Sequence, residues 1–309
     1  MRSKDLIDYI ASNAKISNTI LVEKDFIIQS LLLKVSKNNY FTANYVFKGG
    51  TCLIKCYLGY YRFSEDLDFT YKNQEVFRNK SEKSIRRVLS SEIDKLMGFI
   101  ADICYDIGLD FTAIKDNRRY VEIGGSNRFL TLKAWYKSDM DGKDYFIKFQ
   151  FNFVEDIMYK ILRKKANPLT GKIDKKEATV LFPEESEILL SSPALEVYDI
   201  REILLEKVRA ILTRRFTKER DFVDVYLITQ RIDEKLIDFR DKIIEKTIFM
   251  LKYEKYRQNL ENKTKLKEWI KPGQERHLLL KPLDGFEQFL IETKPFLNEL
   301  VNEILEKQG

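Results

Sequence analysis

The spacing of hydrophobic residues predicts two helices at the start of the chain, over residues 4–12 and 18–37. Apolar side chains in the second segment recur at the three- and four-residue spacing of a buried helix face: Ile20, Leu21, Phe26, Ile27, Leu31, Leu32 and Val35. The charged run 23–25, Glu-Lys-Asp, lies where this face begins, and the simple interpretation is a solvent-facing first turn. An asparagine-rich stretch, 38–44, then indicates a turn.

The next stretch predicts a strand, a short helix and a second strand. Residues 45–47 are apolar, a helical segment runs from Cys52 to about Tyr57, and residues 64–69 form the second strand. A Gly-Gly-Thr sequence lies at the first junction. Because side chains alternate along a strand, the acids on either side of Leu67 are expected on one face of the sheet.

The hydrophobic period then changes from helical to strand-like. Residues 81–107 predict one long amphipathic helix. Strand-like alternation follows over 109–114, over a hairpin at 120–136 and over the β-prone run 145–154. These patterns predict a mixed sheet with helices packed on it.

The last part of the chain predicts helices alone. Residues 164–186 are irregular and basic, which suggests a linker or long loop. Helical patterns follow from Pro193 onward, over about 196–213, 219–230, 234–250, 253–269 and 286–306. The expected fold is α+β, with an α/β domain over residues 1–185 and an all-helical domain over 186–309.

Composition places the chain among ordinary soluble proteins. Hydrophobic residues make up 44% of its 309 residues and charged residues 33%, and no apolar run is long enough for a membrane span. The first residues do not form a secretory signal. Three cysteines without framework spacing suggest free thiols and a cytoplasmic protein. With a single histidine, His277, neither a zinc site nor a histidine-dependent hydrolase is favoured.

The net charge of +6 is concentrated in three basic clusters. They cover residues 163–176, 207–220 and 252–281. Such clusters can form the footprint of a polyanion such as RNA. Each of them alone is also typical of a solvated lysine-rich helix face, and both interpretations stay open.

The stretch from Lys48 to Asp68 carries the candidate chemistry. Glycines at a strand-to-helix junction let backbone N–H groups approach a phosphate. Two carboxylates on one strand face can hold Mg²⁺, which bridges a nucleoside triphosphate. The candidate phosphate-binding residues are Lys48, Gly49, Gly50, Thr51, Arg62 and Ser64, with Lys55 as a further nearby cation. The candidate metal ligands are Asp66 and Asp68. Either element alone is common in structural roles, and the Walker and Rossmann spacings are absent.

The chain resembles a known family at several motifs. Residues 48–53, Lys-Gly-Gly-Thr-x-Leu, followed by residues 62–69, Arg-Phe-Ser-Glu-Asp-Leu-Asp-Phe, look like the signature of the AbiEii/AbiGii toxins in the DNA polymerase β-like nucleotidyltransferase superfamily. The charged run 23–25 resembles the family's Glu-Lys-Asp. Segments 206–210 and 220–226 resemble its Glu-Lys-x-x-Ala and Arg-Asp-x-x-Asp-x-Tyr motifs.

The resemblance implies a nucleotidyltransferase-like N-terminal domain and Mg²⁺-dependent transfer of a nucleotide from an NTP to RNA, with tRNA ends as one acceptor. It also implies a toxin with a separate antitoxin. By position, Asp66 and Asp68 would be metal ligands and catalytic residues. Lys207 would contact the nucleotide, and Asp221 would be a polar or catalytic partner. An ion pair between helices, or on the surface, is the competing interpretation of Lys207 and Asp221.

One position departs from the superfamily pattern. A third carboxylate is expected on the strand 147–153, where this chain has Gln150. An amide is a poorer metal ligand and cannot act as a base. Glu155, beyond the strand, is a candidate replacement. Three functions therefore stay open: an RNA nucleotidyltransferase toxin, a non-catalytic nucleotide- or RNA-binding protein with the same fold, and a transferase of NMP to a protein hydroxyl.

Overall fold

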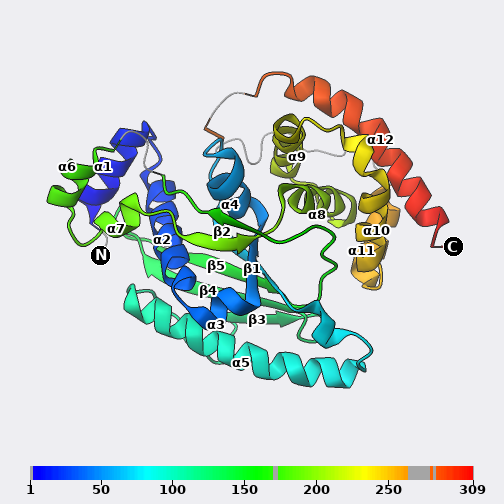
Figure 1. The fold of residues 1–309 in the computed structure, drawn as a ribbon, viewed down its shortest axis with the longest axis horizontal. Coiled ribbons are helices and arrows are strands. Elements are labelled where there is room, and N and C mark those ends of the chain that lie inside the picture. Colours follow the sequence, from blue (N-terminus) through cyan, green and yellow to red (C-terminus); the bar gives the residue numbers. More distant parts are fainter. Residues whose placement is uncertain (1–2, 170–172, 264–278, 281–282, 309) are drawn as a thin grey trace. The chain divides into compact units, whose positions relative to one another are not determined.

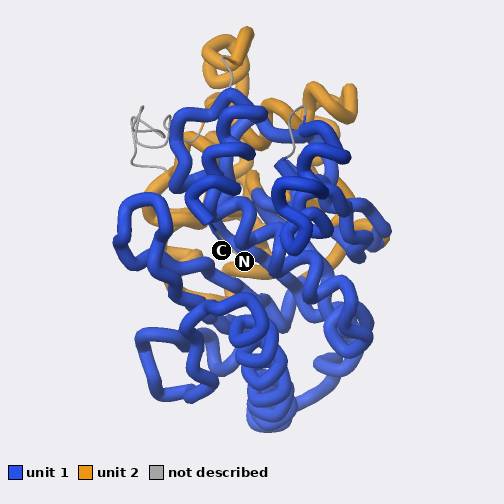
Figure 2. The backbone as a smooth tube through the Cα atoms, turned by 90° about the vertical axis from the view of Figure 1, so that its left-hand side faces the viewer, with its two compact units in different colours: residues 1–155, 161–197 blue, residues 156–160, 198–309 orange. Residues whose placement is uncertain are grey.

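The computed structural model describes residues 3–169, 173–263, 279–280 and 283–308. The chain divides into two compact units, and Figure 2 distinguishes them by colour. The first unit comprises residues 1–155 and 161–197, and the second comprises 156–160 and 198–309. The boundary expected between residues 185 and 186 lies inside the first unit. None of the described helices combines the length and apolar character needed to cross a membrane.

A seven-stranded mixed sheet forms the centre of the first unit, in the order β3-β4-β5-β2-β1-β7-β6 (Figure 1). Its strands are β1 (Tyr45–Lys48), β2 (Asp66–Tyr71), β3 (Val121–Gly124), β4 (Phe129–Lys137), β5 (Asp144–Asn152), β6 (Leu162–Lys165) and β7 (Ala194–Val197). The central strand β2 runs antiparallel to β1 and parallel to β5. This places two segments about eighty residues apart in the sequence side by side.

Nine helical segments accompany the described part of this sheet. They are α1 (Lys4–Ala14), α2 (Thr19–Ser36), α3 (Asn39–Asn44), α4 (Gly49–Leu53), a π-helical turn (Ile54–Leu58), a 3-10 turn (Gln74–Phe77), α5 (Glu82–Asp106), α6 (Lys175–Leu181) and α7 (Ser186–Leu190). Asn18 caps α2 by accepting from the Leu21 N–H, and Ser81 caps α5 in the same way with Ser84.

The two faces of the sheet differ in polarity. On one face the alternating side chains are buried, and Phe41 of α3 packs edge-on against Phe69 of β2 with ring centroids 4.9 Å apart. Phe99 of α5 and Phe151 of β5 complete this aromatic core. Burial of such rings is a main source of stability in a core. The opposite face carries polar residues on the same strands.

The second unit is helical in its described residues. It contains α8 (Ile200–Thr213), α9 (Glu219–Ile232), a 3-10 turn (Leu236–Phe239), α10 (Arg240–Met250), α11 (Glu254–Lys263) and α12 (Phe286–Glu306). The central helix, α8, packs against α9, α10 and α11. A buried ion pair between Glu202 and Lys246, 2.7 Å long, joins α8 to α10. Glu202 also accepts the N–H groups of Met158 and Tyr159, which fastens segment 156–160 to this unit.

Most predicted elements are confirmed, and four local predictions are wrong. Residues 39–44 form a helix rather than a turn, and segment 109–114 contributes only a single bridge, from Asp110 to Trp135. Segment 164–186 contains the end of β6 and helix α6 instead of an irregular linker. The region predicted to be helical from Pro193 begins with β7, a sheet strand. The predicted helix 253–269 is confirmed as far as Lys263, and its remainder and His277 lie outside the described residues.

Candidate active site

A glycine turn joins β1 to α4 in direct contact with an acid of β2. Gly49 has φ +76°, a conformation that disfavours every residue with a Cβ. A Cβ at Gly49 would also lie 2.2 Å from the Oδ2 atom of Asp68. Glycine is therefore required twice at this position, for the backbone conformation and for the close approach of the carboxylate.

The second glycine of the turn packs on Arg62. A Cβ at Gly50 would lie 2.6 Å from the Arg62 Nη2 atom and 3.1 Å from the Ser64 Oγ atom. Arg62 is buried, and its Nη1 donates to the Phe63 carbonyl oxygen. The buried Thr51 hydroxyl lies 2.9 Å from the Ser64 hydroxyl and donates to the Asp66 carbonyl oxygen. These contacts hold the turn against the start of β2.

Asp66 and Asp68 leave the sheet on the same, polar face. Both are partly exposed, whereas Leu67 between them is fully buried. The predicted alternation is confirmed. Asp66 is paired in register with Lys148 of β5, and the Lys148 Nζ atom lies 3.6 Å from the Asp66 Oδ1 atom.

The row of residues beside Asp68 contains the position expected to hold a third acid. Asp68 lies between Lys48 of β1 and Gln150 of β5 in the strand register, and Thr131 of β4 follows beyond Gln150. Residues paired in this way share one face of the sheet. Gln150 is therefore next to Asp68, where its amide oxygen can be a neutral ligand but not a base.

Glu155, the candidate replacement for the third acid, is occupied by an ion pair and a hydrogen bond. Its side chain is completely buried, and its carboxylate lies 3.6 Å from the Lys48 Nζ atom. It also accepts from the Asn152 amide at 3.2 Å. Lys48, one of the predicted phosphate-binding cations, is buried in the same ion pair. Lys48 and Glu155 therefore neutralise each other at the edge of the polar face.

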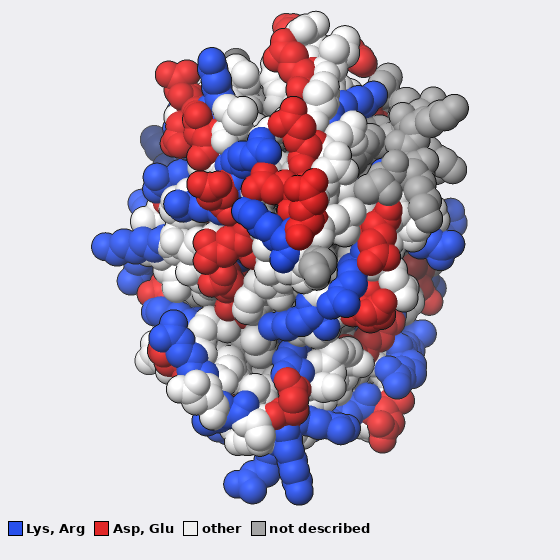
Figure 3. All heavy atoms as spheres, turned by 90° about the vertical axis from the view of Figure 1, so that its right-hand side faces the viewer, with Lys and Arg blue, Asp and Glu red and all other residues white. Residues whose placement is uncertain are grey.

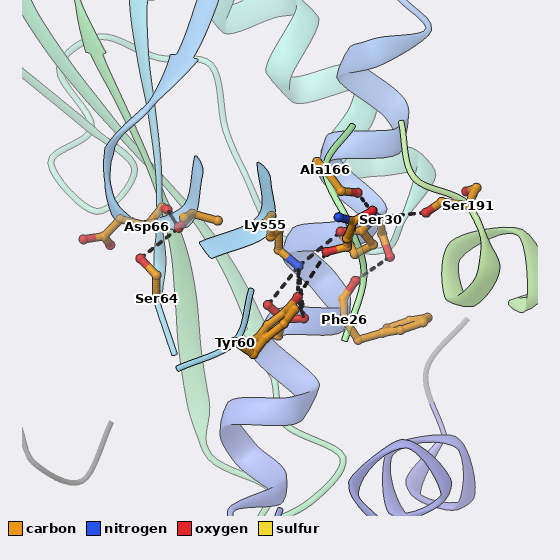
Figure 4. A network of polar contacts seen from close by, with 12 residues as sticks. Phe26, Ser30, Lys55, Tyr60, Ser64, Asp66, Ala166 and Ser191 are labelled. Carbon is orange, nitrogen blue, oxygen red and sulfur yellow. Dashed lines mark hydrogen bonds and ion pairs between the residues drawn. The ribbon is translucent and has the colours of Figure 1, made fainter. Parts of the chain in front are cut away.

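Lys55 belongs to a buried network rather than to the glycine turn. Its ammonium lies 2.9 Å from Asp25 and donates to Gln29 and Tyr60. Figure 4 shows Lys55 beside Tyr60 and α2, separate from the Ser64 and Asp66 side chains. Burial lowers the pKa of Lys55, and the Asp25 carboxylate opposes this shift. The ion pair joins α2 to the π-helical turn that continues the glycine turn.

The charged run Glu23-Lys24-Asp25 was predicted to face solvent, and this prediction is wrong. Glu23 is fully buried and accepts from the Ser138 hydroxyl and the Asp139 N–H. Lys24 makes a 2.7 Å ion pair with Glu65, directly before Asp66. The three charges thus contact three separate segments around the site.

A second charged cluster lies in the helical unit. The Lys207 Nζ atom of α8 is 2.9 Å from Asp221 and 2.7 Å from Asp224, both on α9. Arg214 pairs with the other oxygen of Asp221. Burial raises the pKa of Asp221, but the attraction of Lys207 and Arg214 outweighs it and leaves the pKa lowered. The predicted partners Lys207 and Asp221 are therefore brought together, as an ion pair between helices.

The sequence matches a model of one protein family, described as the nucleotidyl transferase AbiEii toxin of a type IV toxin–antitoxin system, over residues 31–307. The chain belongs to the AbiEii family. No protein of curated function matches it in sequence. Two crystal structures from Helicobacter pylori resemble its fold, JHP933 and a candidate nucleotidyltransferase. Their sequence identities are 17% and 16%, and each has a TM-score of 0.44 over 93% of this chain and 94% or 95% of its own.

Family membership decides the enzyme class. The chain is a nucleotidyltransferase of the toxin type, and such a family implies an NTP substrate and an antitoxin partner. The roles of individual residues stay predictions, as does a cytoplasmic location. In the first unit the structure brings Asp68, Arg62 and Ser64 against the glycine turn and leaves Lys55 in a separate network. In the second unit it pairs Lys207 with Asp221.

The donor set of this AbiEii chain fits Mg²⁺. Among the residues that the structure describes, no cluster of three or more His, Cys, Asp or Glu side chains is arranged to hold a metal ion. Mg²⁺, however, is usually held by one or two carboxylates together with substrate phosphates. Asp66 and Asp68 provide that pair of oxygen ligands on one face.

Sequence reasoning missed several charged residues around these sites. Lys148 and Arg214 were not expected to contact Asp66 and Asp221, and Asp224 was noted only as part of a motif. The signal for Lys148 was present, because it lies two residues before Gln150 and so shares its face of β5. Arg214 follows the last residue of α8 and carries no local signal for its partner.

Proposed function

We propose that this chain catalyses Mg²⁺-dependent transfer of NMP from an NTP to the end of an RNA, with tRNA as one acceptor. The observation that carries the proposal is the direct contact between the Asp68 carboxylate and the positive-φ Gly49. It brings the acid that would bind the metal against the turn that would receive the triphosphate. Such proximity is what phosphoryl and nucleotidyl transfer require from a protein.

Each residue of the turn has a role in this proposal. Asp66 and Asp68 would hold Mg²⁺, which supplies positive charge to the triphosphate and lowers the pKa of an attacking hydroxyl. The backbone of Gly50 and Thr51 would orient the phosphates. Arg62 packs against Gly50 and thereby fixes the shape of the glycine turn. The Lys148 ammonium, close to Asp66, is a further positive charge for the phosphates.

The RNA acceptor is supported by the basic character of the chain, which has 54 basic and 48 acidic residues. The three predicted clusters contribute unequally. Lys207 and Arg214, from the second cluster, are neutralised by Asp221. Arg163 and Lys165, from the first, stand on the edge strand β6 with exposed side chains.

A non-catalytic nucleotide-binding function is the second candidate, and Gln150 is the observation that favours it. The neighbours of Asp68 in that row are Lys48 and Gln150, and neither is an acid that could take a proton from the acceptor. The next acid in the described row is Glu122 of β3, which pairs with Lys133. NMP transfer to a protein hydroxyl would use the same site.

The deciding experiment incubates the protein with Mg²⁺, each α-labelled NTP in turn, and either total RNA or total protein. We expect label on RNA with the wild type and at least about 100-fold slower labelling with Asp68→Ala. Asp102→Ala, an exposed acid on α5, is the matched control and retains transfer. Label on protein would identify the other acceptor, and NTP binding without any labelled product would establish the non-catalytic function.

A further inference from the structure

A basic cleft lies in the first unit, on the N-terminal half of α5. Its volume is about 720 Å³. Four of its nine lining residues are cationic (Lys83, Arg86, Arg87 and Lys115), three are serines, and none is acidic. Figure 3 shows Lys and Arg side chains gathered at the lower end of the molecule, where α5 begins. None of the predicted nucleotide-binding residues lines this cleft.

Hydrogen bonds tie the walls of the cleft to α5. The Asn127 side chain, in the β3–β4 turn, donates to the Arg86 carbonyl oxygen at 3.2 Å. On the other side, the Lys115 ammonium donates to the Ser90 hydroxyl at 3.0 Å and to Asp94 at 2.8 Å. Three segments distant in sequence therefore form one preorganised groove.

Three of the cations are available to a ligand. Lys83, Arg86 and Arg87 are exposed, and none of them makes an ion pair with another described residue. The neighbouring acids are engaged, because Glu82 pairs with Arg128 and Asp94 with Lys115. Like charges at helix positions i, i+3 and i+4 repel each other. An anion in the cleft would relieve this repulsion.

The lining favours phosphate groups over a nucleobase. Ile123 is its single apolar side chain, and no aromatic ring contributes to it. Small-molecule pockets that hold a base are lined mainly by apolar and aromatic groups, whereas contacts to a nucleic-acid backbone come from Arg, Lys and Ser. The cleft therefore fits a sugar–phosphate backbone.

The location of the cleft favours an extended ligand. α5 covers the apolar face of the sheet, opposite to Asp66 and Asp68. In the strand register, Phe129 at the start of β4 is level with Thr70, near the far end of β2 from Asp66. Asp66 and Thr70 are about 13 Å apart along the strand. Across the sheet, the three inter-strand steps from β2 through β5 and β4 to β3 add roughly 14 Å. A single NTP cannot span this distance, whereas a folded RNA can.

We propose that this cleft binds backbone phosphates of the RNA acceptor through Lys83, Arg86 and Arg87. This inference rests on the proposed function. It adds a docking site on the face of the sheet opposite to Asp66 and Asp68. This site would recognise RNA by charge and shape rather than by sequence.

The test measures binding of fluorescein-labelled bulk tRNA by anisotropy, without NTP, in the full-length protein. The variant is K83Q/R86Q/R87Q. The matched control is K4Q/K95Q/K294Q, which removes the same charge from exposed lysines outside the cleft and outside the three basic clusters. Thermal unfolding checks that both variants are folded, and a fluorescent ATP analogue reports nucleotide binding separately.

We expect the cleft variant to raise the Kd for tRNA about 100-fold at 0.1 M salt and to reduce the slope of log Kd against log salt by about 2, because three phosphate contacts are lost. The control changes the Kd by less than about threefold, and ATP-analogue binding is unchanged in both. If the cleft variant binds tRNA as the wild type does, or loses the ATP analogue instead, the inference is overturned.

The labelling experiment separates this inference from the proposed function. Persistent labelling of RNA with unaltered tRNA binding by the cleft variant would overturn only the docking site. If the wild type binds tRNA but transfers no label to it, the proposed function fails, and the salt dependence of the cleft variant still decides the docking site. If the wild type neither binds nor labels RNA, both fail.

Discussion

The acids of the sheet and those of the helical unit are of the same type but lie in opposite environments. Asp66 and Asp68 stand on a partly exposed face, and Asp66 has one cation, Lys148, at a loose 3.6 Å. Asp221 and Asp224 are 1% and 0% exposed and share Lys207 at hydrogen-bonding distance. The first pair is partly open to solvent, whereas the second pair is enclosed together with its counterions.

A motif of acids and lysines therefore identifies a catalytic site only when the solvation of its side chains is also known. A partly exposed carboxylate keeps its oxygens for a ligand, but a buried one must be neutralised within the fold. The sheet acids therefore suit metal binding and the helical acids suit a structural ion pair.

The largest effect is expected for Asp221→Ala, on stability. Removing one member of a buried ion pair leaves Lys207 and Arg214 less well compensated, which costs about 3–5 kcal/mol in the free energy of unfolding. Urea titration followed by circular dichroism measures this change. Asp241→Ala, an exposed acid in the first turn of α10, is the control and loses less than about 1 kcal/mol. Wild-type stability combined with loss of NTP binding would show that the pair serves the nucleotide instead.

The pH dependence of Asp221→Asn sharpens this result. The pKa of Asp221 is lowered in the fold from the ordinary value of 3.8. Its contribution to stability is therefore complete above the unfolded pKa and is lost as the pH falls toward the folded pKa. The stability difference between wild type and variant should stay constant from about pH 7 to 5 and shrink below about pH 4. A difference that grew on acidification would contradict the assigned direction of the pKa shift.

Asp68→Ala is expected to act on activity rather than stability. Loss of one charged group that stabilises the transition state lowers kcat by about 10²–10³-fold. The midpoint of urea unfolding should move little, because Asp68 is partly exposed. Single-turnover transfer of labelled NMP gives the rate. A collapse in stability of the size predicted for Asp221→Ala would erase the contrast between the two regions.

Gln150→Glu is expected to strengthen metal binding. It adds a negative oxygen ligand beside Asp68, so we expect Mn²⁺ to bind about tenfold more tightly, or about 1.4 kcal/mol. Electron paramagnetic resonance of free Mn²⁺ measures the affinity. Gln150→Met, similar in size but without a charge, leaves the affinity within about twofold. An unchanged affinity of Gln150→Glu for Mn²⁺ would show that the metal does not bind beside Asp68 and residue 150.

Lys148→Gln is expected to have the smallest effect. The pair with Asp66 is about one-third exposed on both sides and therefore contributes less than about 1 kcal/mol to stability. Removing the ammonium should tighten Mn²⁺ binding by about threefold, because a competing cation leaves Asp66. Weaker Mn²⁺ binding in the absence of NTP would show that Lys148 orients Asp66 instead.

Patterns with a strong local signal were predictable. The helix over 82–106 and the hairpin of β3 and β4 follow from hydrophobic periods sustained over many residues. The short strands β6 and β7 were not, because four residues provide too little periodicity to distinguish a strand from a loop. Their identity comes from pairing with each other and with β1.

Local sequence patterns were sufficient to predict the family and the elements of the candidate site: a strand, a glycine turn, and two acids on one face of the next strand. These features depend on neighbours within about twenty residues. The residues that surround these elements come from tertiary contacts. Parallel pairing of β2 with β5 placed Gln150 beside Asp68 and Lys148 beside Asp66, helix packing buried Glu23 and Asp25, and three distant segments formed the basic cleft of α5. The physical reason is that strand register, burial and charge compensation depend on contacts between residues far apart in the chain, for which a local pattern carries no information.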